Sequence, residues 1–176
     1  MTHKIVRYLN NPNLERPAQS IAEHEFDTPE LHQLIEDMFE TMYASHGLGL
    51  AAPQIDVHKR LTVIDTSGGE ADVTPNKVIL INPEIIFREG KQTGEEGCLS
   101  IPGFREEVKR HKRVTVRARN AKGETIEESG EDLMARAMQH EIDHLNGILF
   151  LTHLSPLKRE VIKRKIRKMI QAGEWD

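Results

Sequence analysis

The amino-acid sequence predicts an α+β fold: a single domain, residues 1–176, in which antiparallel strands surround a central metal-binding helix and a further helix follows at the C-terminus. Three patterns carry this prediction: short runs rich in β-branched residues, a helical segment with two histidines, and a C-terminal repeat of apolar residues among basic ones. A chain of 176 residues with 38% hydrophobic content can fold alone, burying roughly 70% of the surface that its unfolded form exposes. No internal repeat or low-complexity linker indicates a second domain.

The first predicted helix covers residues 28–43, "TPELHQLIEDMFETMY". Thr28 is a suitable N-cap, and Pro29 fits the first helical position, where its missing N–H costs no hydrogen bond. One face of this helix carries apolar side chains at helical spacing, namely Leu31, Leu34, Ile35, Met38, Phe39 and Met42. We interpret the segment as a scaffold helix that buries this stripe in the core.

Three runs rich in β-branched residues are predicted to be strands: "RLTVID" (60–65), "KVILIN" (77–82) and "RVTVRAR" (113–119). The third run alternates apolar and polar residues, which is typical of a strand with one buried face. The segment 66–76 is a polar connection, and "AKGE" (121–124) indicates a turn between strands.

Two more helices are predicted near the C-terminus. The first begins at Glu131 and Asp132, whose charges favour a helix N-terminus, and ends at Gly147, a natural C-terminal stop. The second follows Ser155-Pro156. Its apolar residues recur among basic ones at Leu157, Val161, Ile166 and Ile170.

The formal net charge is −4 with 30% charged residues, which gives the chain no general attraction to nucleic acid or to an anionic membrane. The first residues lack the apolar core of a signal peptide, and no segment approaches the ~20 apolar residues of a membrane span. We therefore expect a cytoplasmic protein with no membrane partner. Cys98 is the single cysteine, so no internal disulfide can form, and nothing indicates an oligomeric state.

The segment "QHEIDHLNG" (139–147) has the pattern of a metal-binding helix. Residues four apart on a helix differ by ~40° around its axis and ~6 Å along it, so His140 and His144 project from one face and can hold one ion. Glu141 stands beside the first histidine, where its carboxylate can address a metal-activated water without being a ligand. Histidine pairs at this spacing also occur by chance on solvated helices, but the glutamate makes that the minority interpretation.

A catalytic site of this kind usually needs a third protein ligand. In the metzincin pattern the third ligand is a histidine, and Phe150 occupies that place here despite the matching Gly147. The downstream glutamates, Glu160 and Glu174, are poor candidates because one lies in a basic helix and the other near the C-terminus. His153 stays possible, since its geometry just past the helix is not fixed by the sequence.

Cys98, in "GEEGCLSIPG", is the remaining candidate. Glu95 and Glu96 would raise the pKa of a free thiol, which makes an unassisted nucleophile unattractive. A bound dication would instead deprotonate the sulfur and make it a strong ligand. The surrounding glycines are typical of a shaped loop that approaches a ligand closely. We favour this role over that of a buried spectator.

Three motifs in order, "GLGLAAPQ" (47–54), "EEGCLSIPG" (95–103) and "QHEIDHLNG" (139–147), resemble those of the peptide deformylases. The resemblance covers the chain from its first helix onward. It implies one metal ion held by Cys98, His140 and His144, natively Fe(II), with zinc, nickel or cobalt able to occupy the site. It also implies hydrolysis of the N-formyl group from formyl-methionyl nascent chains, with release of formate.

The same resemblance assigns the chemistry to three residues. Glu141 would take the proton of the attacking water and hand it to the departing amine. The side-chain amide of Gln54 and the backbone N–H of Leu99 would stabilise the charge that develops on the formyl oxygen, each worth roughly 3–4 kcal/mol in comparable sites. Because an Fe(II)–thiolate centre is open to oxidation at the metal and at sulfur, we expect activity to be lost in air.

The resemblance also implies a peptide-binding surface. The backbone of Gly49 and Gly97 would pair with the substrate in strand fashion, and the methionine would enter an apolar pocket of Leu48, Ala137 and the aliphatic stem of Arg136. For Asp143 we expect either orientation of a ligand or an ion pair with a nearby arginine.

The predicted C-terminal helix concentrates seven cations: Lys158, Arg159, Lys163, Arg164, Lys165, Arg167 and Lys168. A solvated face of an amphipathic helix is the common explanation. In an otherwise acidic chain, and by the resemblance, the cluster also fits contact with ribosomal RNA near the peptide exit. Two other functions stay open, a zinc endopeptidase, which Phe150 disfavours, and a non-catalytic ribosome-binding module with a closed structural metal site, which would need a fourth ligand.

Overall fold

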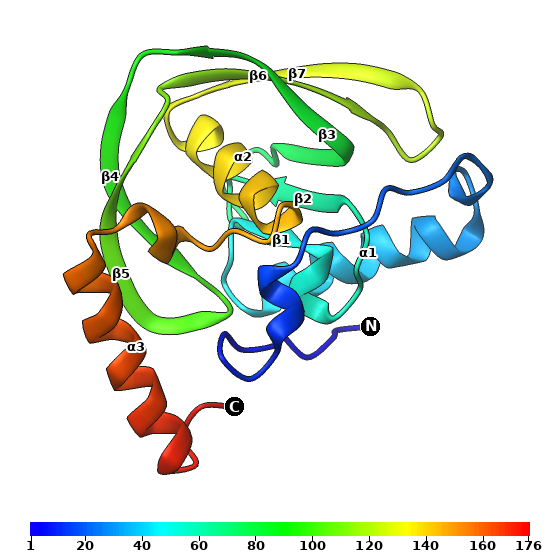
Figure 1. Cartoon of the computed structure of the whole chain (residues 1–176). Helices are drawn as coiled ribbons and strands as arrows, with labels where there is room; N and C mark the ends of the chain where they lie inside the picture. Colours follow the sequence, from blue (N-terminus) through cyan, green and yellow to red (C-terminus); the bar gives the residue numbers. More distant parts are fainter.

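The computed structural model describes all residues, 1–176, as two antiparallel sheets around the helix α2, Asp132–Leu145 (Figure 1). The larger sheet has the strand order β1-β2-β3-β6-β7, and the smaller one pairs β4 with β5. The strands are β1 Gly49–Ala51, β2 Leu61–Asp65, β3 Lys77–Glu89, β4 Gln92–Cys98, β5 Ile101–Arg110, β6 Arg113–Arg119 and β7 Thr125–Glu131. The other helices are α1 Pro29–Ala44 and α3 Pro156–Gln171, with 3-10 turns at η1 Pro12–Glu15, η2 Glu23–Glu25, η3 Ala52–Ile55 and η4 Phe150–His153.

The predicted α+β fold, with antiparallel strands around a central helix and a helix at the C-terminus, is confirmed. Figure 1 shows α2 in the middle of the molecule, with β6 and β7 above it, the β4–β5 hairpin to its left and α3 apart at the lower left. Helix α2 contacts strands of both sheets, and its two histidines, His140 and His144, contact residues of the hairpin.

Helix α1 forms where the sequence predicts it. The Thr28 hydroxyl caps its N-terminus by accepting from the Leu31 N–H at 3.2 Å. Its apolar stripe is buried except for Leu34, which is partly exposed, and packs on Leu50, Leu61 and neighbouring residues of β1 and β2. This core holds β1 in place beside α2.

The larger sheet packs against α2. All five residues of β2 are buried, and Val114, Val116 and Ala118 of β6 alternate with more exposed residues, as expected for a strand with one buried face. The three β6 residues and Ile64 of β2 share a core with residues of α2, namely Ala135, Met138 and Ile142. The predicted strand 77–82 continues to Glu89, through register shifts that bend the strand.

The expectation of a shaped loop around Cys98 was wrong. Residues 92–110 form the β4–β5 hairpin, with Glu95 opposite Glu107 and Glu96 opposite Glu106, and only Leu99 and Ser100 lie in the turn. This hairpin has few β-branched residues and many charges, so neither composition nor alternation predicted its strands. The turn predicted at 121–124 joins β6 to the polar edge strand β7, whose bounds were not predicted, and β1 was missed because its three residues are too few to form a pattern.

The C-terminal part closes the fold. Gly147 ends α2 with a φ of +76°, and a Cβ there would lie 2.7 Å from the carbonyl carbon of Glu15, so this position requires glycine. Phe150 is 1% exposed and belongs to the core. Of the four apolar residues that define the predicted C-terminal repeat, only Ile166 is buried, and the helix packs instead by Ile162 and Ile166.

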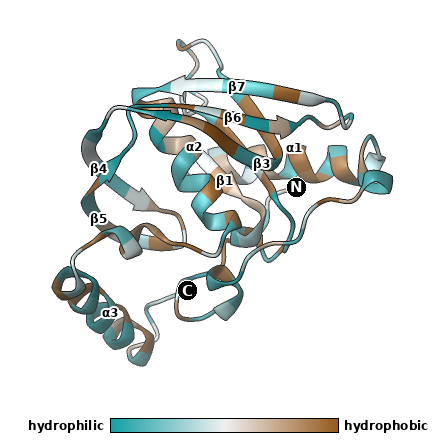
Figure 2. Ribbon diagram, turned by 45° about the horizontal axis from the view of Figure 1, so that its top comes forward, coloured by the Kyte–Doolittle hydropathy of each residue, from teal (hydrophilic) through white to brown (hydrophobic).

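Figure 2 shows α3 at one side of the fold, with hydrophilic and hydrophobic residues interspersed along the helix. The remaining apolar residues of the predicted repeat, Leu157, Val161 and Ile170, are exposed. None of the helices combines the length and the apolar character that crossing a membrane requires.

Candidate active site

Three side chains that could hold a metal ion converge between the hairpin and α2. Helix α2 presents His140 and His144, and Cys98 is the last residue of β4; their ligand atoms all lie within 4.8 Å of one another. His144 Nε2 lies 3.4 Å from Cys98 Sγ and 3.2 Å from His140 Nε2. A tetrahedral ion with bonds of ~2.3 Å to sulfur and ~2.1 Å to nitrogen places its ligand atoms roughly 3.4–3.6 Å apart, so the cluster fits one such ion.

The other candidate ligands lie elsewhere. His153 is directed to Asp143, with its Nε2 2.9 Å from Asp143 Oδ2. Glu141 is not part of the cluster, although its Oε1 lies 3.8 Å from His140 Nε2. The cluster thus offers three protein ligands, which leaves a tetrahedral ion one position for water or substrate and disfavours a closed structural site.

Glu96 orients the first histidine. It is buried, and its Oε1 accepts from His140 Nδ1 at 2.9 Å, which directs Nε2 of that ring to the cluster. Arg110 donates to both carboxylate oxygens at 2.8 Å, and Arg136 donates to Oε2 at 2.5 Å. Burial raises the pKa of Glu96, but the hydrogen bonds and charges of Arg110 and His140 lower it by more, so the pKa of this carboxyl group lies well below its usual range.

Sequence reasoning missed this role of Glu96. It treated the residue only as a negative neighbour of Cys98, because nothing in "GEEGC" tells which glutamate points inward. The strand pairing of the hairpin decides which glutamate points inward: Glu95 is exposed, whereas Glu96 is 4% exposed. The expected ion pair of Asp143 exists, because Arg110 Nη1 donates to Asp143 Oδ2 at 2.6 Å.

The two histidines have opposite pKa shifts in the protein without an ion. Burial lowers the pKa of His140, but the Cys98 sulfur, the Glu96 carboxylate and the charge of Glu141 raise it to about 10. Burial and the neighbouring charge of His140 hold the pKa of His144 well below its usual value. The two rings therefore differ in their readiness to carry a proton, and the buried Nδ1 of His144 has no hydrogen-bond partner.

Glu141 is placed to carry protons. Its side chain is buried beneath β1, and its Oε2 has no hydrogen-bond partner. Burial raises its pKa to about 7, with the charge of His140 acting in the opposite direction, so it can bind and release a proton near neutral pH. Only glycine allows β1 to pass so near, since a Cβ on Gly49 would lie 2.9 Å from Glu141 Cγ.

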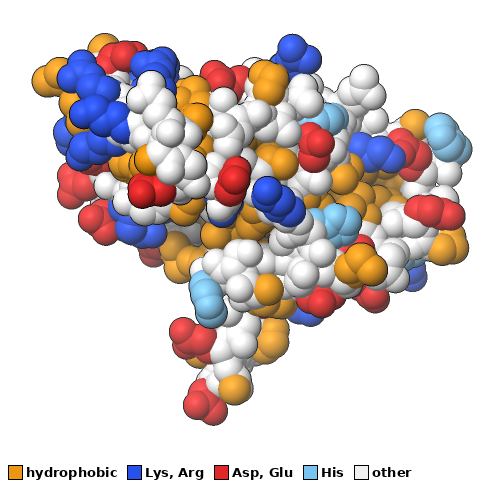
Figure 3. Space-filling model, turned by 90° about the horizontal axis from the view of Figure 1, so that it is seen from below, with side chains coloured by type: hydrophobic (Ala, Val, Ile, Leu, Met, Phe, Trp, Pro, Cys, Tyr) orange, Lys and Arg blue, Asp and Glu red, His pale blue; other side chains and the backbone are white.

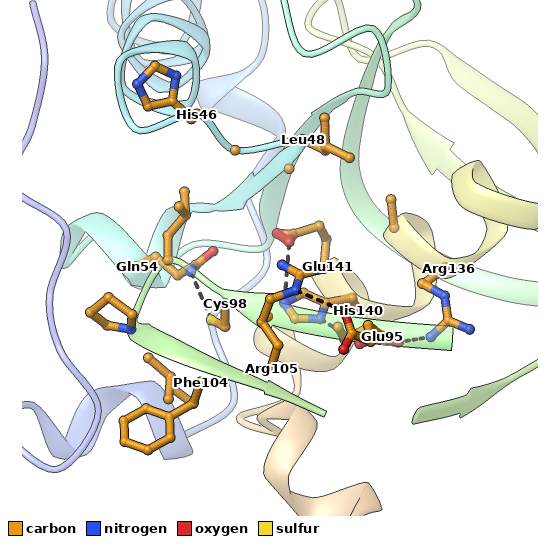
Figure 4. Close-up of a pocket in the computed structure, with 18 of the residues that line it drawn as sticks. His46, Leu48, Gln54, Glu95, Cys98, Phe104, Arg105, Arg136, His140 and Glu141 are labelled. Atoms are coloured by element: carbon orange, nitrogen blue, oxygen red, sulfur yellow. Dashed lines mark hydrogen bonds and ion pairs between the residues drawn. The ribbon is translucent and has the colours of Figure 1, made fainter. Parts of the chain in front are cut away.

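Gln54 points its amide nitrogen into the same space (Figure 4). Its Oε1 accepts from the Ala51 N–H at 2.9 Å, and its Nε2 lies 3.5 Å from Cys98 Sγ and 3.3 Å from Ser100 Oγ. The nitrogen is therefore held as a donor toward the cluster. Beside it, Arg7 donates to the Leu99 carbonyl at 3.0 Å and fixes the hairpin turn, a role that the sequence did not indicate.

A cleft of about 290 Å³ opens over these groups. The sequence-predicted residues that line it are Leu48, Gly49, Gln54, Gly97, Cys98, Leu99, Arg136, Ala137, His140 and Glu141. His144 is the predicted site residue outside this lining, and it lies behind the others at 1% exposure. The guanidinium of Arg136, for which the sequence made no prediction, is buried and donates to Glu96 and to the Val108 carbonyl.

Four lining residues lie outside the three motifs and were missed: His46, Phe104, Arg105 and Leu133. Their places in the sequence carried a signal, since the first precedes the "GLGLAAPQ" motif, the next two follow "SIPG", and the last lies one helical turn before Arg136. Figure 4 shows His46 and Leu48 on one side of the cleft and Phe104 and Arg105 on the other.

Comparison with known proteins gives consistent similarities. Residues 2–160 match the family model described as polypeptide deformylase. A peptide deformylase of Acidobacterium capsulatum is 54% identical over 175 residues, which cover 99% of both chains. Among solved structures, a peptide deformylase from Legionella pneumophila has a TM-score of 0.87 and 42% identity, covering 100% of this chain and 99% of its own. The peptide deformylase of Thermus thermophilus has a TM-score of 0.84 and 38% identity, covering 98% and 97%.

Proposed function

Since this chain belongs to the polypeptide deformylase family, whose members remove the N-formyl group from nascent polypeptides, we propose that it acts through a divalent ion held by Cys98, His140 and His144. The chain is a metal-dependent hydrolase. The observation that carries the proposed ligand set is the convergence of one sulfur and two imidazole nitrogens at separations that fit a single tetrahedral ion.

Fe(II) is our proposal for the native ion, with zinc, nickel and cobalt as substitutes. One thiolate and two imidazoles can bind all four metals, so the donor set does not select among them. The family resemblance favours Fe(II), and metal supply decides which ion is bound. When bound, such an ion supplies the positive charge that makes a water molecule nucleophilic near neutral pH.

Glu141 serves as the proton carrier in this proposal. Its carboxylate takes a proton from the attacking water and delivers it to the nitrogen that leaves as the new N-terminal amine. Burial with one unpartnered oxygen, together with a pKa raised to about 7, supports both directions of transfer. Typical contributions of such a group are roughly 10²- to 10⁴-fold in rate.

Negative charge on the formyl oxygen is met by the Gln54 amide and the backbone N–H of Leu99. The hydrogen bond from Ala51 N–H to the other end of the Gln54 amide supports this assignment, because it fixes which end of the amide faces the cleft. Preorganised donors of this kind cost no rearrangement as the charge develops.

The peptide would enter between the two sheets. Strand β1 is an edge of the larger sheet and β4 pairs only with β5, so each keeps backbone groups free for an added strand. We assign this pairing to Gly49 and Gly97, and the methionine pocket to Leu48, Ala137 and the carbon stem of Arg136, all of which line the cleft.

For the ribosome near the peptide exit we propose a contact through α3. Figure 3 shows lysine and arginine side chains gathered at the end of the face where α3 lies, and α3 carries all seven cations of the predicted cluster. Nascent chains are reached in the cytoplasm, where we place the enzyme. Changing the exposed Arg164, Lys165, Arg167 and Lys168 to glutamine should release the protein from ribosomes at lower salt without loss of activity on a free formyl peptide. Truncation of the helix is the poorer test, because Ile162, Ile166 and Trp175 are buried.

The ligand set is tested by measuring formate released from a formyl-methionyl peptide by protein loaded with Fe²⁺ without oxygen. We expect release by the wild type, none from the acetylated peptide, and loss of both metal and activity in Cys98→Ala. A Cys98→Ala variant that keeps its metal and its activity would contradict the proposed ligands. Exposure to air should inactivate the Fe²⁺ form before the Co²⁺ form.

A further inference from the structure

His153 lies in η4, outside the metal cluster, at the outer end of a chain of hydrogen bonds that leads to His140. The ring of His153 contacts Asp143 and Arg110. Arg110 in turn donates to Glu96, and Glu96 accepts from His140 Nδ1. The side chains become less exposed along this chain, from 35% at His153 and 20% at Asp143 to 4% at Arg110 and Glu96.

Three atoms at the outer end form a closed triangle. Arg110 Nη1 lies 2.6 Å from Asp143 Oδ2, His153 Nε2 lies 2.9 Å from the same oxygen, and the two nitrogens are 3.2 Å apart. The guanidinium nitrogen carries only hydrogens, so it donates to Oδ2. The arrangement is satisfied when His153 Nε2 also carries a hydrogen and donates to Oδ2.

Asp143 Oδ2 therefore accepts from two donors, and each of them comes from an element other than α2, Arg110 from β5 and His153 from η4. His153 joins η4 to α2, and Arg110 joins α2 to the hairpin. The Arg110 fork uses its other two nitrogens on Glu96, at 2.8 Å each. A shift of Nη1 away from Asp143 would rotate this planar fork as a whole, because the guanidinium is rigid.

We propose that His153 is a positioning residue for the metal site: by fixing the Asp143 oxygen that anchors Arg110, its imidazole keeps Glu96 aligned on the ring of His140. The inference rests on the proposed ligand set. Groups that hold a metal-bound histidine through its second nitrogen typically change metal affinity 10- to 100-fold. His153 acts on Glu96 through two intervening residues, Asp143 and Arg110, so the expected effect is smaller, about fivefold.

The test measures Co²⁺ affinity by competition with a chelator, and the visible absorption spectrum of the Co²⁺ protein. His153→Leu should bind Co²⁺ about fivefold more weakly and shift the spectrum, because the geometry at the ion changes. His153→Gln places an amide N–H near the position of Nε2 and should restore both. Equal losses in the two variants, or wild-type affinity and spectrum in His153→Leu, would overturn the proposal.

Two controls separate this role from a general loss of stability and from failure of the metal site. His58→Leu removes an exposed imidazole paired with Asp56, with a similarly exposed ring (36%), and should leave Co²⁺ binding unchanged. In an Asp143→Asn background, His153→Leu should cause no further loss, and an additive loss would overturn the route through Asp143. Wild-type Co²⁺ affinity in Cys98→Ala would refute the ligand set and this inference together. Lost Co²⁺ affinity in Cys98→Ala, with wild-type affinity in His153→Leu, would refute the positioning role alone.

Discussion

Replacing Glu141 by glutamine should stabilise the metal-free protein while it abolishes catalysis. The carboxyl group is buried, and burial raises its pKa from 4.5 to about 7. The folded state therefore holds this proton more tightly than the unfolded state, and stability falls as the pH rises from about 4.5 through 7. The difference of about 2.5 pKa units at ~1.4 kcal/mol each gives a cost of about 3 kcal/mol above pH 7, which an uncharged glutamine avoids.

The measurement is urea unfolding of the metal-free wild type and of Glu141→Gln at pH 5 and pH 8. The variant should exceed the wild type by about 3 kcal/mol in free energy of unfolding at pH 8, and by no more than about 1 kcal/mol at pH 5, where most of the penalty is absent. Glu160→Gln, at an exposed position on α3, should differ by no more than about 0.5 kcal/mol at either pH.

Catalysis should move in the opposite direction. Loss of the proton carrier should reduce formate release about 10²- to 10⁴-fold in the metal-loaded variant. The reasoning would be refuted by an equal gain in stability at both pH values, which would indicate packing, by no gain at pH 8, or by retained activity.

The surroundings of the cluster give three further expectations. Gln54→Leu should slow formate release about 10²- to 10³-fold by removing a donor to the formyl oxygen, with Co²⁺ affinity unchanged; full activity would exclude that role. Gly49→Ala should lower activity without loss of Co²⁺, because its Cβ would lie 2.9 Å from Glu141 Cγ, and unchanged formate release would show that β1 can move aside. Glu96→Gln should weaken Co²⁺ binding about 10- to 100-fold and lower the free energy of unfolding by about 3 kcal/mol, since buried Arg110 loses its carboxylate; wild-type values in both assays would contradict this.

The parts of the site that depend on neighbours in the chain could be predicted from the sequence. His140 and His144 face the same way because of the helical repeat alone, and Glu141 stands beside them for the same reason. The three motifs in order then identified the family and the α+β fold. Helix α1 and strand β6 were also predictable, because the apolar residues of each repeat with the period of their own backbone.

Other features depend on contacts between residues far apart in the chain, and only the tertiary structure decided them. The β4–β5 hairpin has a composition typical of a loop, yet its pairing turns Glu96 inward and brings Cys98 within 3.4 Å of His144. His153 looked like a possible ligand by its place in the chain, but η4 directs its ring to Asp143 instead. The physical reason is that backbone periodicity fixes directions within one element, whereas the position of one element against another follows from the packing of both.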